Sequence, residues 1–299
     1  MRVSGFSFAR NAVKLGYPLR ESLLSTLPVV DELVVAVAPG DSDDDTRGLV
    51  ASIDDERVRI VDAVWDGGRR QRVYADLTNA ALDACRGDWC LYVQADEVLH
   101  EDDHATVLGR CEELLGDPRV HGLLFDYLHF FGDYDHLQTG HGWYRREIRV
   151  VRNGIGVRSA RDAQSFRFAG ESRIDVAPAR ARIFHYGWVR DPRTMQTKVR
   201  EFWSHRRSPD EVASEHGDVR SFDYGPLGRL ERYCGTHPGV MAGRIASMDW
   251  RHELREVDQP GMKRALHRDE RPSFRLLSAL SRVTGVDLNH TNHRRELNV

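Results

Sequence analysis

Carboxylates directly follow an apolar stretch in the first third of the chain. Residues 89–93 (WCLYV) are apolar, residues 94–97 read QADE, and three more acids follow by residue 103. Hard divalent cations prefer carboxylate oxygens, and Mg²⁺ is usually held by one or two carboxylates together with substrate phosphates. Asp96 is therefore a candidate ligand for a metal that bridges a diphosphate. The alternative is that these acids only stabilise the start of a following helix through its dipole.

A second acidic cluster follows another apolar run. Residues 32–39 (ELVVAVAP) precede residues 41–45 (DSDDD). Here Asp41 or Asp43 could accept hydrogen bonds from a nucleotide base or a ribose. In open α/β sheets, ligands bind beyond the carboxyl ends of the strands. We therefore expect both acidic clusters at the same edge of one sheet.

The elements that position these acids can be predicted from the hydrophobic pattern. The apolar runs at residues 32–39, which are rich in Val, and at residues 58–65 and 89–93 are typical of strands buried on both faces of a parallel sheet. Residues 18–28 and 71–85 carry apolar side chains at helical spacing. This alternation of strands and helices predicts an α/β fold with a doubly wound half.

The alternation of predicted strands and helices ends after residue 104. Residues 121–131, 147–153 and 182–188 read as strands with few helices between them, which predicts a mixed or antiparallel extension of the sheet. Residues 191–207 form a helical pattern with an apolar face. We expect one domain over residues 1–207. We interpret residues 208–299 as a linker or long loop, up to about residue 226, followed by a helical C-terminal extension with helices in residues 240–250 and 273–285.

The bulk composition suits a globular protein with a substantial core. The chain has 299 residues, of which 40% are hydrophobic and 30% charged, and its net charge is -3. This balance does not favour nucleic acid as a partner. No run approaches the roughly 20 apolar residues of a membrane span, and the N-terminus lacks the pattern of a secretory signal. We expect a cytoplasmic protein that can still contact a membrane from the side.

Five stretches, in this order, carry a resemblance to a known family. They are SGFSFARNAVKLGYPLRESLLSTLPVVDELVVAV, GDSDDDT, TNAALDACRGDWCLYVQADEVL, YRREIRVVRN and IFHYGWVRDP. The ordered set resembles bacterial family 2 glycosyltransferases. That resemblance implies the GT-A fold, a Rossmann-like mixed sheet flanked by helices. It implies an inverting, Mn²⁺- or Mg²⁺-dependent hexosyltransferase that moves a sugar from a UDP- or GDP-sugar to the hydroxyl of a carbohydrate or lipid-linked acceptor. Cell-surface glycan synthesis is the family-level role, and formation of a homo-oligomer is left open.

The resemblance also assigns nucleotide-binding residues. Phe8 and Arg10 fall at the end of the first strand, where members of the family contact the nucleotide. Asp41 and Asp43 fall where an acid binds uracil or ribose, with the choice between them open. Gln94 occupies the first position of the family's DxD motif, where it can hydrogen-bond ribose but carries no charge.

The metal ligands follow from the same motif. Asp96 matches its second acid, the one expected to bind Mn²⁺ or Mg²⁺, and Glu97 is a second candidate. His185 is either a hydrogen-bonded core residue or a contact to the metal or diphosphate from the opposite wall. Arg190 and Lys198 could neutralise phosphate, or belong to a solvated helix face.

The general base is expected after the strand at residues 147–153. Asp162 lies in the region where the family places its base. The alternative is a loop acid paired with Arg158 or Arg161. Asp126 and Asp133 are weaker rivals for the role.

Two other functions remain as alternatives. A nucleotidyltransferase that makes sugar nucleotides would usually have a glycine-rich basic loop near its N-terminus, and residues 4–16 contain none. A non-catalytic nucleotide-binding module of the same fold is the second alternative, because Gln94 replaces an acid.

Overall fold

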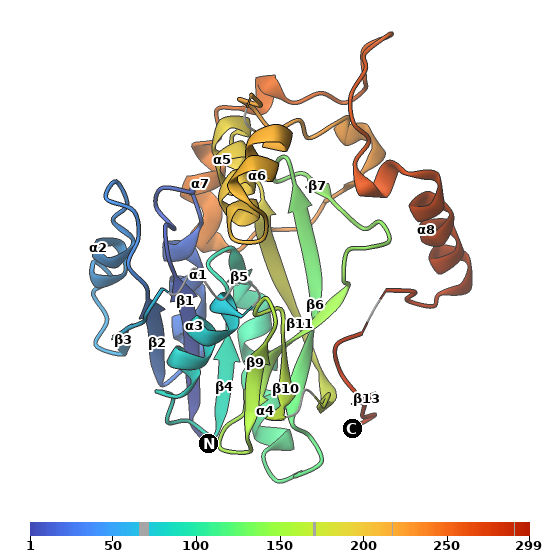
Figure 1. Cartoon of the computed structure of the whole chain (residues 1–299). Coiled ribbons are helices and arrows are strands. Elements are labelled where there is room, and N and C mark those ends of the chain that lie inside the picture. Colours follow the sequence, from blue (N-terminus) through green and yellow to red (C-terminus); the bar gives the residue numbers. More distant parts are fainter. Residues whose placement is uncertain (66–71, 170–171, 217, 290) are drawn as a thin grey trace.

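The computed structural model of the protein describes residues 1–65, 72–169, 172–216, 218–289 and 291–299. Its centre is a mixed sheet, drawn in Figure 1. Four parallel strands form the first half, in the order β3-β2-β1-β4. Their bounds are β1 (Val3–Ala9), β2 (Glu32–Val37), β3 (Val58–Asp62) and β4 (Trp89–Tyr92).

The second half of the sheet is mixed. Strand β8 (Arg146–Arg152) pairs antiparallel with β4, and β6 (Gly122–Phe131) pairs antiparallel with β8. The long strand β11 (Asp175–Trp188) runs parallel to β6 and antiparallel to the short β5 (Glu97–Leu99). The shorter pieces are β7 (His136–Leu137), β12 (Glu231–Arg232) and β13 (Arg295–Glu296), while β9 (Val157–Ala160) and β10 (Ser165–Phe168) form a separate hairpin.

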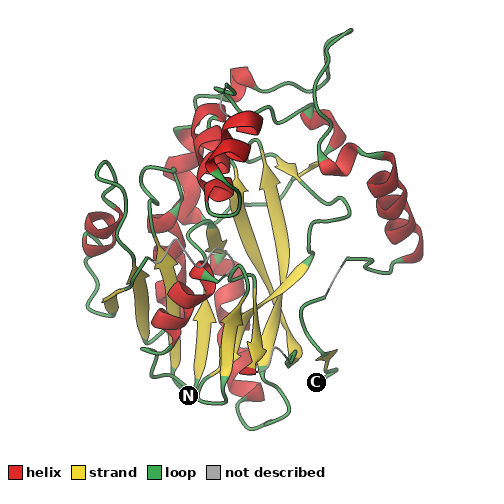
Figure 2. Cartoon of the chain, in the orientation of Figure 1, coloured by secondary structure: helices red, strands yellow, loops and turns green. Residues whose placement is uncertain are grey.

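Helices cover both faces of the sheet (Figure 2). The α-helices are α1 (Leu19–Thr26), α2 (Thr46–Ala51), α3 (Val73–Leu82), α4 (His104–Leu114), α5 (Pro192–Ser204), α6 (Pro209–His216), α7 (Ala242–Ala246) and α8 (Pro272–Thr284). Short 3-10 turns lie at Leu27–Val29, Glu101–Asp103, Leu227–Arg229, Gly239–Met241, Arg251–Glu253 and Arg268–Glu270.

Two hydrophobic clusters hold the helices to the sheet. Leu19 and Leu23 of α1 pack with Val107 of α4 in the first cluster. Leu77 and Ala81 of α3 pack with side chains of β1, β2 and β4 in the second. Each fully buried leucine contributes about 1.5–3 kcal/mol. The two faces of the sheet therefore have separate cores, and the strand ends between them are left to form the site.

The predicted α/β fold, with a mixed, Rossmann-like sheet flanked by helices, is confirmed. One local prediction is wrong: residues 209–216 form α6 rather than part of a loop. Ser208 and Glu211 form a capping box there, since the Ser208 backbone N–H donates to the Glu211 carboxylate (2.8 Å) and the Glu211 N–H donates to the Ser208 hydroxyl (3.4 Å). Pro209 at the first helical position favours the same helix.

The predicted C-terminal extension returns to the sheet. Strand β12 pairs with β7, and β13 pairs with β11. The predicted helices are present as α7 and α8, and the division of the chain at residue 207 stays a prediction. Within the described ranges, no helix is both long and apolar enough to cross a membrane.

Candidate active site

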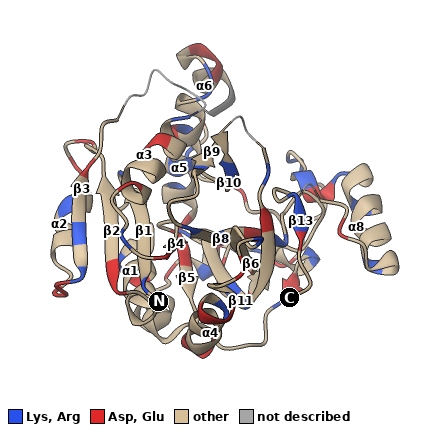
Figure 3. Ribbon diagram, turned by 90° about the horizontal axis from the view of Figure 1, so that it is seen from below, with Lys and Arg blue, Asp and Glu red and all other residues tan. Residues whose placement is uncertain are grey.

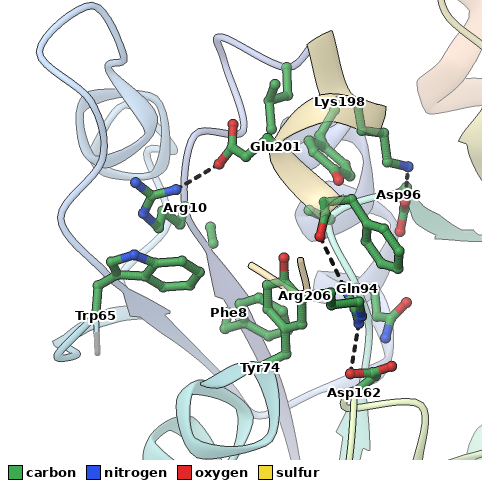
Figure 4. A pocket seen from close by; sticks show the side chains of 15 residues that line it. Phe8, Arg10, Trp65, Tyr74, Gln94, Asp96, Asp162, Lys198, Glu201 and Arg206 are labelled. Carbon is green, nitrogen blue, oxygen red and sulfur yellow. Dashed lines mark hydrogen bonds and ion pairs between the residues drawn. The ribbon is translucent and has the colours of Figure 1, made fainter. Parts of the chain in front are cut away.

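A cavity of about 230 Å³ lies at the carboxyl ends of β1 and β4, beneath α5 (Figure 4). The ends of β1 and β4 and the residues that follow them supply one part of its lining, and Lys198, Glu201 and Phe202 of α5 supply another. The lining residues are Phe8, Ala9, Arg10, Leu15, Tyr17, Trp65, Tyr74, Gln94, Ala95, Asp96, Asp162, Lys198, Glu201, Phe202 and Arg206. Five of the nine predicted site residues therefore line one cavity: Phe8, Arg10, Gln94, Asp96 and Asp162.

One end of the cavity is aromatic. The rings of Phe8 and Tyr74 stack with centroids 5.8 Å apart. The guanidinium carbon of Arg10 lies 4.2 Å from the centroid of the Trp65 ring. Flat aromatic and guanidinium surfaces can bind a planar base by stacking. This end of the cavity is thus suited to a nucleobase.

A network of ion pairs fixes Arg10 at that end. Its guanidinium contacts the carboxylates of Glu201 at 2.6 Å and of Asp41 at 3.1 Å. Lys14 in turn contacts Asp41 and Asp43, each at 2.8 Å. Asp41 and Asp43 lie outside the cavity lining, where they hold the basic side chains of its rim. Their predicted contact with a base or ribose stays a prediction.

The two neighbouring acids after β4 have different surroundings. Glu97 is fully buried, and its carboxylate accepts two hydrogen bonds from the buried Arg149, at 2.7 and 2.8 Å. It also accepts from the Tyr127 hydroxyl at 2.7 Å and from the backbone N–H of Gln94 at 3.1 Å. Glu97 does not line the cavity, and its hydrogen-bonding capacity is used within the core. We therefore do not retain Glu97 as a metal ligand, and its carboxylate instead fixes the turn that aims Gln94 and Asp96.

Asp96 points into the cavity, toward the side chains of Lys198 and His185. Its Oδ2 lies 3.5 Å from Lys198 Nζ and 3.8 Å from His185 Nε2. Burial raises the pKa of Asp96, but Lys198, His185 and Arg190 outweigh burial, so its pKa lies below the ordinary value. Burial, together with Arg190, lowers the pKa of Lys198 to about 7. Asp96 is therefore ionised at neutral pH.

A chain of two histidines sets the tautomer of His185. Burial lowers the pKa of His129 to about 3 and that of His185 to about 4, so both rings are neutral at pH 7. His129 Nε2 lies 2.7 Å from the carbonyl oxygen of Tyr144, which can only accept, so Nε2 carries the His129 proton. The Nδ1 atoms of the two rings are 3.0 Å apart, so His185 Nδ1 must donate to His129. His185 Nε2 is left with a lone pair directed to the Asp96 side.

Gly187 keeps the space between these two groups open. A Cβ at position 187 would lie 2.5 Å from His185 Nε2 and 2.8 Å from Asp96 Oδ2. The hydrogen bond to His129 orients the His185 ring. A carboxylate oxygen of Asp96 and the imidazole lone pair of His185 then make a donor set that fits Mn²⁺ or Mg²⁺. No three His, Cys, Asp or Glu side chains of the described ranges cluster as a complete metal site. Asp96 and His185 would thus hold the ion jointly with donor phosphates.

Asp162 also lines the cavity, in the turn between β9 and β10 and next to Gln94, whose side chain donates to the Ala163 carbonyl at 3.1 Å. Its carboxylate pairs with Arg206 at 2.7 Å and is half-exposed. The residues on either side of it, Arg161 and Ala163, have positive φ angles of 57° each. Such angles in non-glycine residues are costly and are enriched at functional sites. Of the two ion pairs that formed the alternative for Asp162, the one with Arg158 is not formed, because Arg158 pairs with Asp83.

Several lining residues were not predicted. Trp65 follows the end of β3, so the strand-end rule that selected Asp96 would have selected it. Tyr74, Glu201 and Arg206 lie on or just after helices, and only the folded chain brings them to the cavity. The rival bases Asp126 and Asp133 do not line it.

Comparisons with known proteins give only weak similarity. No protein-family model matches the chain, and no curated protein is significantly similar to it. Among solved structures, TarS 1-349 of S. aureus is 19% identical with a TM-score of 0.33, over 48% of this chain and 39% of that chain. Glucosyl-3-phosphoglycerate synthase of Mycobacterium tuberculosis, with Mn²⁺, UDP and glucosyl-3-phosphoglycerate, is 18% identical with a TM-score of 0.29, over 44% and 45% of the two chains. Mannosyltransferase PcManGT of Pyrobaculum calidifontis, with GDP-Man and Mn²⁺, is 20% identical with a TM-score of 0.32, over 43% and 36%. The chain thus spans less than half the length of these structures, and the similarity is too low to place a ligand here.

Proposed function

We propose that the protein is a nucleotide-sugar-dependent glycosyltransferase of the GT-A type. The observation that carries this proposal is the cavity at the strand ends. Its aromatic end and its Asp96 end, next to which His185 is buried, match the base and the diphosphate of a nucleotide-sugar. The ordered motifs that resemble family 2 glycosyltransferases support the same assignment, with an inverting, hexosyl-transferring reaction.

In this proposal the nucleotide lies along the cavity. The base stacks between the walls formed by Phe8, Tyr74, Trp65 and Arg10. Gln94 lies between the two ends, and its side-chain N–H donates to the Ala163 carbonyl at 3.1 Å. That bond leaves the Gln94 amide oxygen to accept from a ribose hydroxyl. UDP- or GDP-sugars are the expected donors.

The diphosphate lies at the charged end. Lys198 and Arg190 both donate to the carbonyl oxygen of Gly187, Lys198 at 2.6 Å, so this point holds the Arg190 charge and an amine that is about half protonated at pH 7. Asp96 and the Nε2 lone pair of His185 would hold Mn²⁺ or Mg²⁺. The ion, when bound, supplies Lewis-acid stabilisation of the charge that develops on the departing diphosphate.

The reaction is a substitution at the anomeric carbon. The bond from that carbon to the phosphate oxygen breaks as the acceptor oxygen bonds to it, through a transition state with oxocarbenium character. The acceptor hydroxyl must lose its proton, and we propose that a carboxylate oxygen of Asp162 accepts it. Arg206 holds that carboxylate at the cavity wall.

The experiment is a titration of UDP and GDP, with and without Mn²⁺, followed by a thermal-shift screen of nucleotide-sugars and an assay for slow hydrolysis. Asp162→Asn should abolish transfer and preserve donor binding. Asp126→Asn is the matched control, because Asp126 is exposed on β6 outside the cavity. Nucleotide binding without hydrolysis or transfer would instead support the non-catalytic module. Failure to bind either nucleotide would overturn the proposal.

We also propose a cytoplasmic, membrane-peripheral location. Helix α8 stands outside the sheet, on the side of β13, in two views of the molecule (Figures 1 and 3). It exposes Leu276 (63%), Leu280 (45%) and Val283 (87%) along one stripe. The helix contains no acidic residue, and arginines 275 and 282 flank the stripe. An apolar stripe with basic flanks is suited to the surface of an anionic membrane, where a lipid-linked acceptor would reside.

A further inference from the structure

A second cavity, of about 440 Å³, lies on the other side of the β9–β10 turn. Three parts of the chain converge on it: the loop before β8, the β9–β10 hairpin, and the C-terminal segment. Its lining residues are His141, Gly142, Tyr144, Ala160, Arg161, Gln164, Ser165, Arg167, Arg268, Leu288, Asn289 and Asn292. Three of these are arginines, and none is an acid.

Arg268 lies at the exposed side of this cavity, against an aromatic ring. Its guanidinium carbon lies 4.6 Å from the centroid of the Phe274 ring. On its other side is Gly142, where an added Cβ would lie 3.3 Å from the same carbon and where φ is +96°. A side chain at position 142 would therefore be strained and would crowd the guanidinium. Arg268 forms no ion pair with any described residue, so its charge is not neutralised within the described part of the chain.

The walls next to Arg268 offer hydrogen-bonding groups. Asn289 and Asn292 line the cavity, and each is itself fixed: Asn289 accepts from the Gly142 N–H at 2.7 Å, and Asn292 donates to Glu147 at 2.6 Å. The Nδ1 atom of His141 is buried without a partner in the described part of the molecule. Two acids lie behind these walls: Glu147, which is buried, and Asp287, which accepts from the backbone and side-chain N–H groups of Asn289. The lining itself carries three arginines and no acid, which favours an anion.

Residues of the turn between β9 and β10 line both cavities. The alternating positive φ angles at 161 and 163 send Asp162 into the first cavity, while Arg161 and Gln164 line the second. A molecule bound in the second cavity would thus lie against the turn that carries the proposed base. We propose that the second cavity binds a phosphate or carboxylate group of the acceptor, so that the protein glycosylates an anionic acceptor. The role of the bound molecule as an acceptor rests on the proposed function, whereas the binding of an anion is argued from the cavity alone.

The test uses inorganic phosphate as the probe, titrated by calorimetry into the full-length protein. Arg268→Gln should weaken phosphate binding about tenfold or more, since charge-assisted bonds are the strong ones. Arg275→Gln is the matched control, because Arg275 lies on α8 and does not line this cavity. It should bind phosphate like the wild type. Equal phosphate affinity in both variants, or loss of binding in Lys198→Met instead, would overturn the proposal by placing the ion elsewhere.

UDP binding, measured on the same proteins, separates this inference from the proposed function. Arg268→Gln should leave UDP affinity unchanged. If UDP fails to bind the wild type while phosphate binding still depends on Arg268, the proposed function fails and the anion site stands. In transfer assays, glucose 6-phosphate should be preferred to glucose, and Arg268→Gln should remove the preference while donor hydrolysis persists. The absence of any preference in the wild type would refute the acceptor role.

Discussion

Neutralising Glu97 and neutralising Asp96 should have opposite consequences, although the two acids are adjacent. Glu97 and Arg149 are both fully buried, and the carboxylate accepts four hydrogen bonds. A glutamine at 97 keeps the shape but replaces one acceptor oxygen with a donor that faces another donor. Arg149 is then left as an uncompensated buried charge. Breaking a buried ion pair in this way costs about 3–5 kcal/mol.

That cost is large against the whole stability of a domain, about 5–15 kcal/mol. It corresponds to a fall in Tm of roughly 5–8 °C for a chain of this size. Asp96→Asn should cost only about 1–2 kcal/mol, because Lys198 keeps its bond to the Gly187 carbonyl at 2.6 Å. Although its stability changes little, Asp96→Asn should weaken the Mn²⁺-dependent part of UDP binding by at least about tenfold.

The assay is thermal unfolding and UDP calorimetry on the same three proteins: wild type, Glu97→Gln and Asp96→Asn. We expect Glu97→Gln to lose stability, and Asp96→Asn to lose the Mn²⁺ effect while melting near the wild type. A Glu97→Gln protein that melts within about 2 °C of the wild type and loses the Mn²⁺ effect would refute the reasoning. It would return Glu97 to the metal site.

Three further predictions concern the cavity walls and the surface. Gly187→Ala should abolish Mn²⁺ binding measured by paramagnetic resonance, because the new Cβ would lie 2.5 Å from His185 Nε2. Gly109→Ala is the control, since nothing lies within 4 Å of a Cβ at that position. Unchanged Mn²⁺ binding in Gly187→Ala would exclude the Asp96–His185 site. Glu147→Gln should raise Tm at pH 7. Burial raises the folded pKa of Glu147 above 4.5, so the stabilising contribution of its protonated form is present below pH 4.5 and is lost as pH rises through the folded pKa. A gain in Tm that persists unchanged at pH 4 would contradict this origin. Replacing Leu276, Leu280 and Val283 with serine should reduce co-sedimentation with phosphatidylglycerol vesicles, because the stripe can no longer insert its apolar side chains. Equal sedimentation of the triple variant and the wild type would show that the stripe does not bind lipid.

The parallel half of the sheet could be predicted from the sequence because its signals are local. Short apolar runs identified β2, β3 and β4, although β3 is only partly buried rather than buried on both faces. Apolar side chains at helical spacing identified α1, whose Leu19 and Leu23 are buried. Asp96 followed from the rule that ligands bind at strand ends. The same reasoning would have found Trp65, and the SPDE capping box would have found α6.

Other parts of the site depend on contacts that no local pattern encodes. His129 meets His185 only because β6 and β11 pair in parallel with these two residues in register. The second cavity requires residues 141, 161 and 268 to meet from three distant segments. The Asp96–Glu97 pair lies between these cases. Successive side chains of an extended chain point to opposite sides, so two adjacent acids at the start of β5 are not expected to face one cavity.

The charges around Asp96 also bear on how strongly donor binding depends on a metal. One carboxylate there faces Lys198 and Arg190, which the Gly187 carbonyl holds in place. A bound diphosphate would bring negative charge close to Arg190 and Lys198, and that charge favours the protonated form of Lys198, whose pKa is otherwise about 7, so these two side chains can stabilise the diphosphate before an ion binds. A divalent ion bound by Asp96 and His185 must then share Asp96 with Lys198, whose Nζ lies 3.5 Å away. The geometry therefore favours measurable UDP or GDP affinity without metal, with the ion acting mainly on the charge that develops as the sugar departs.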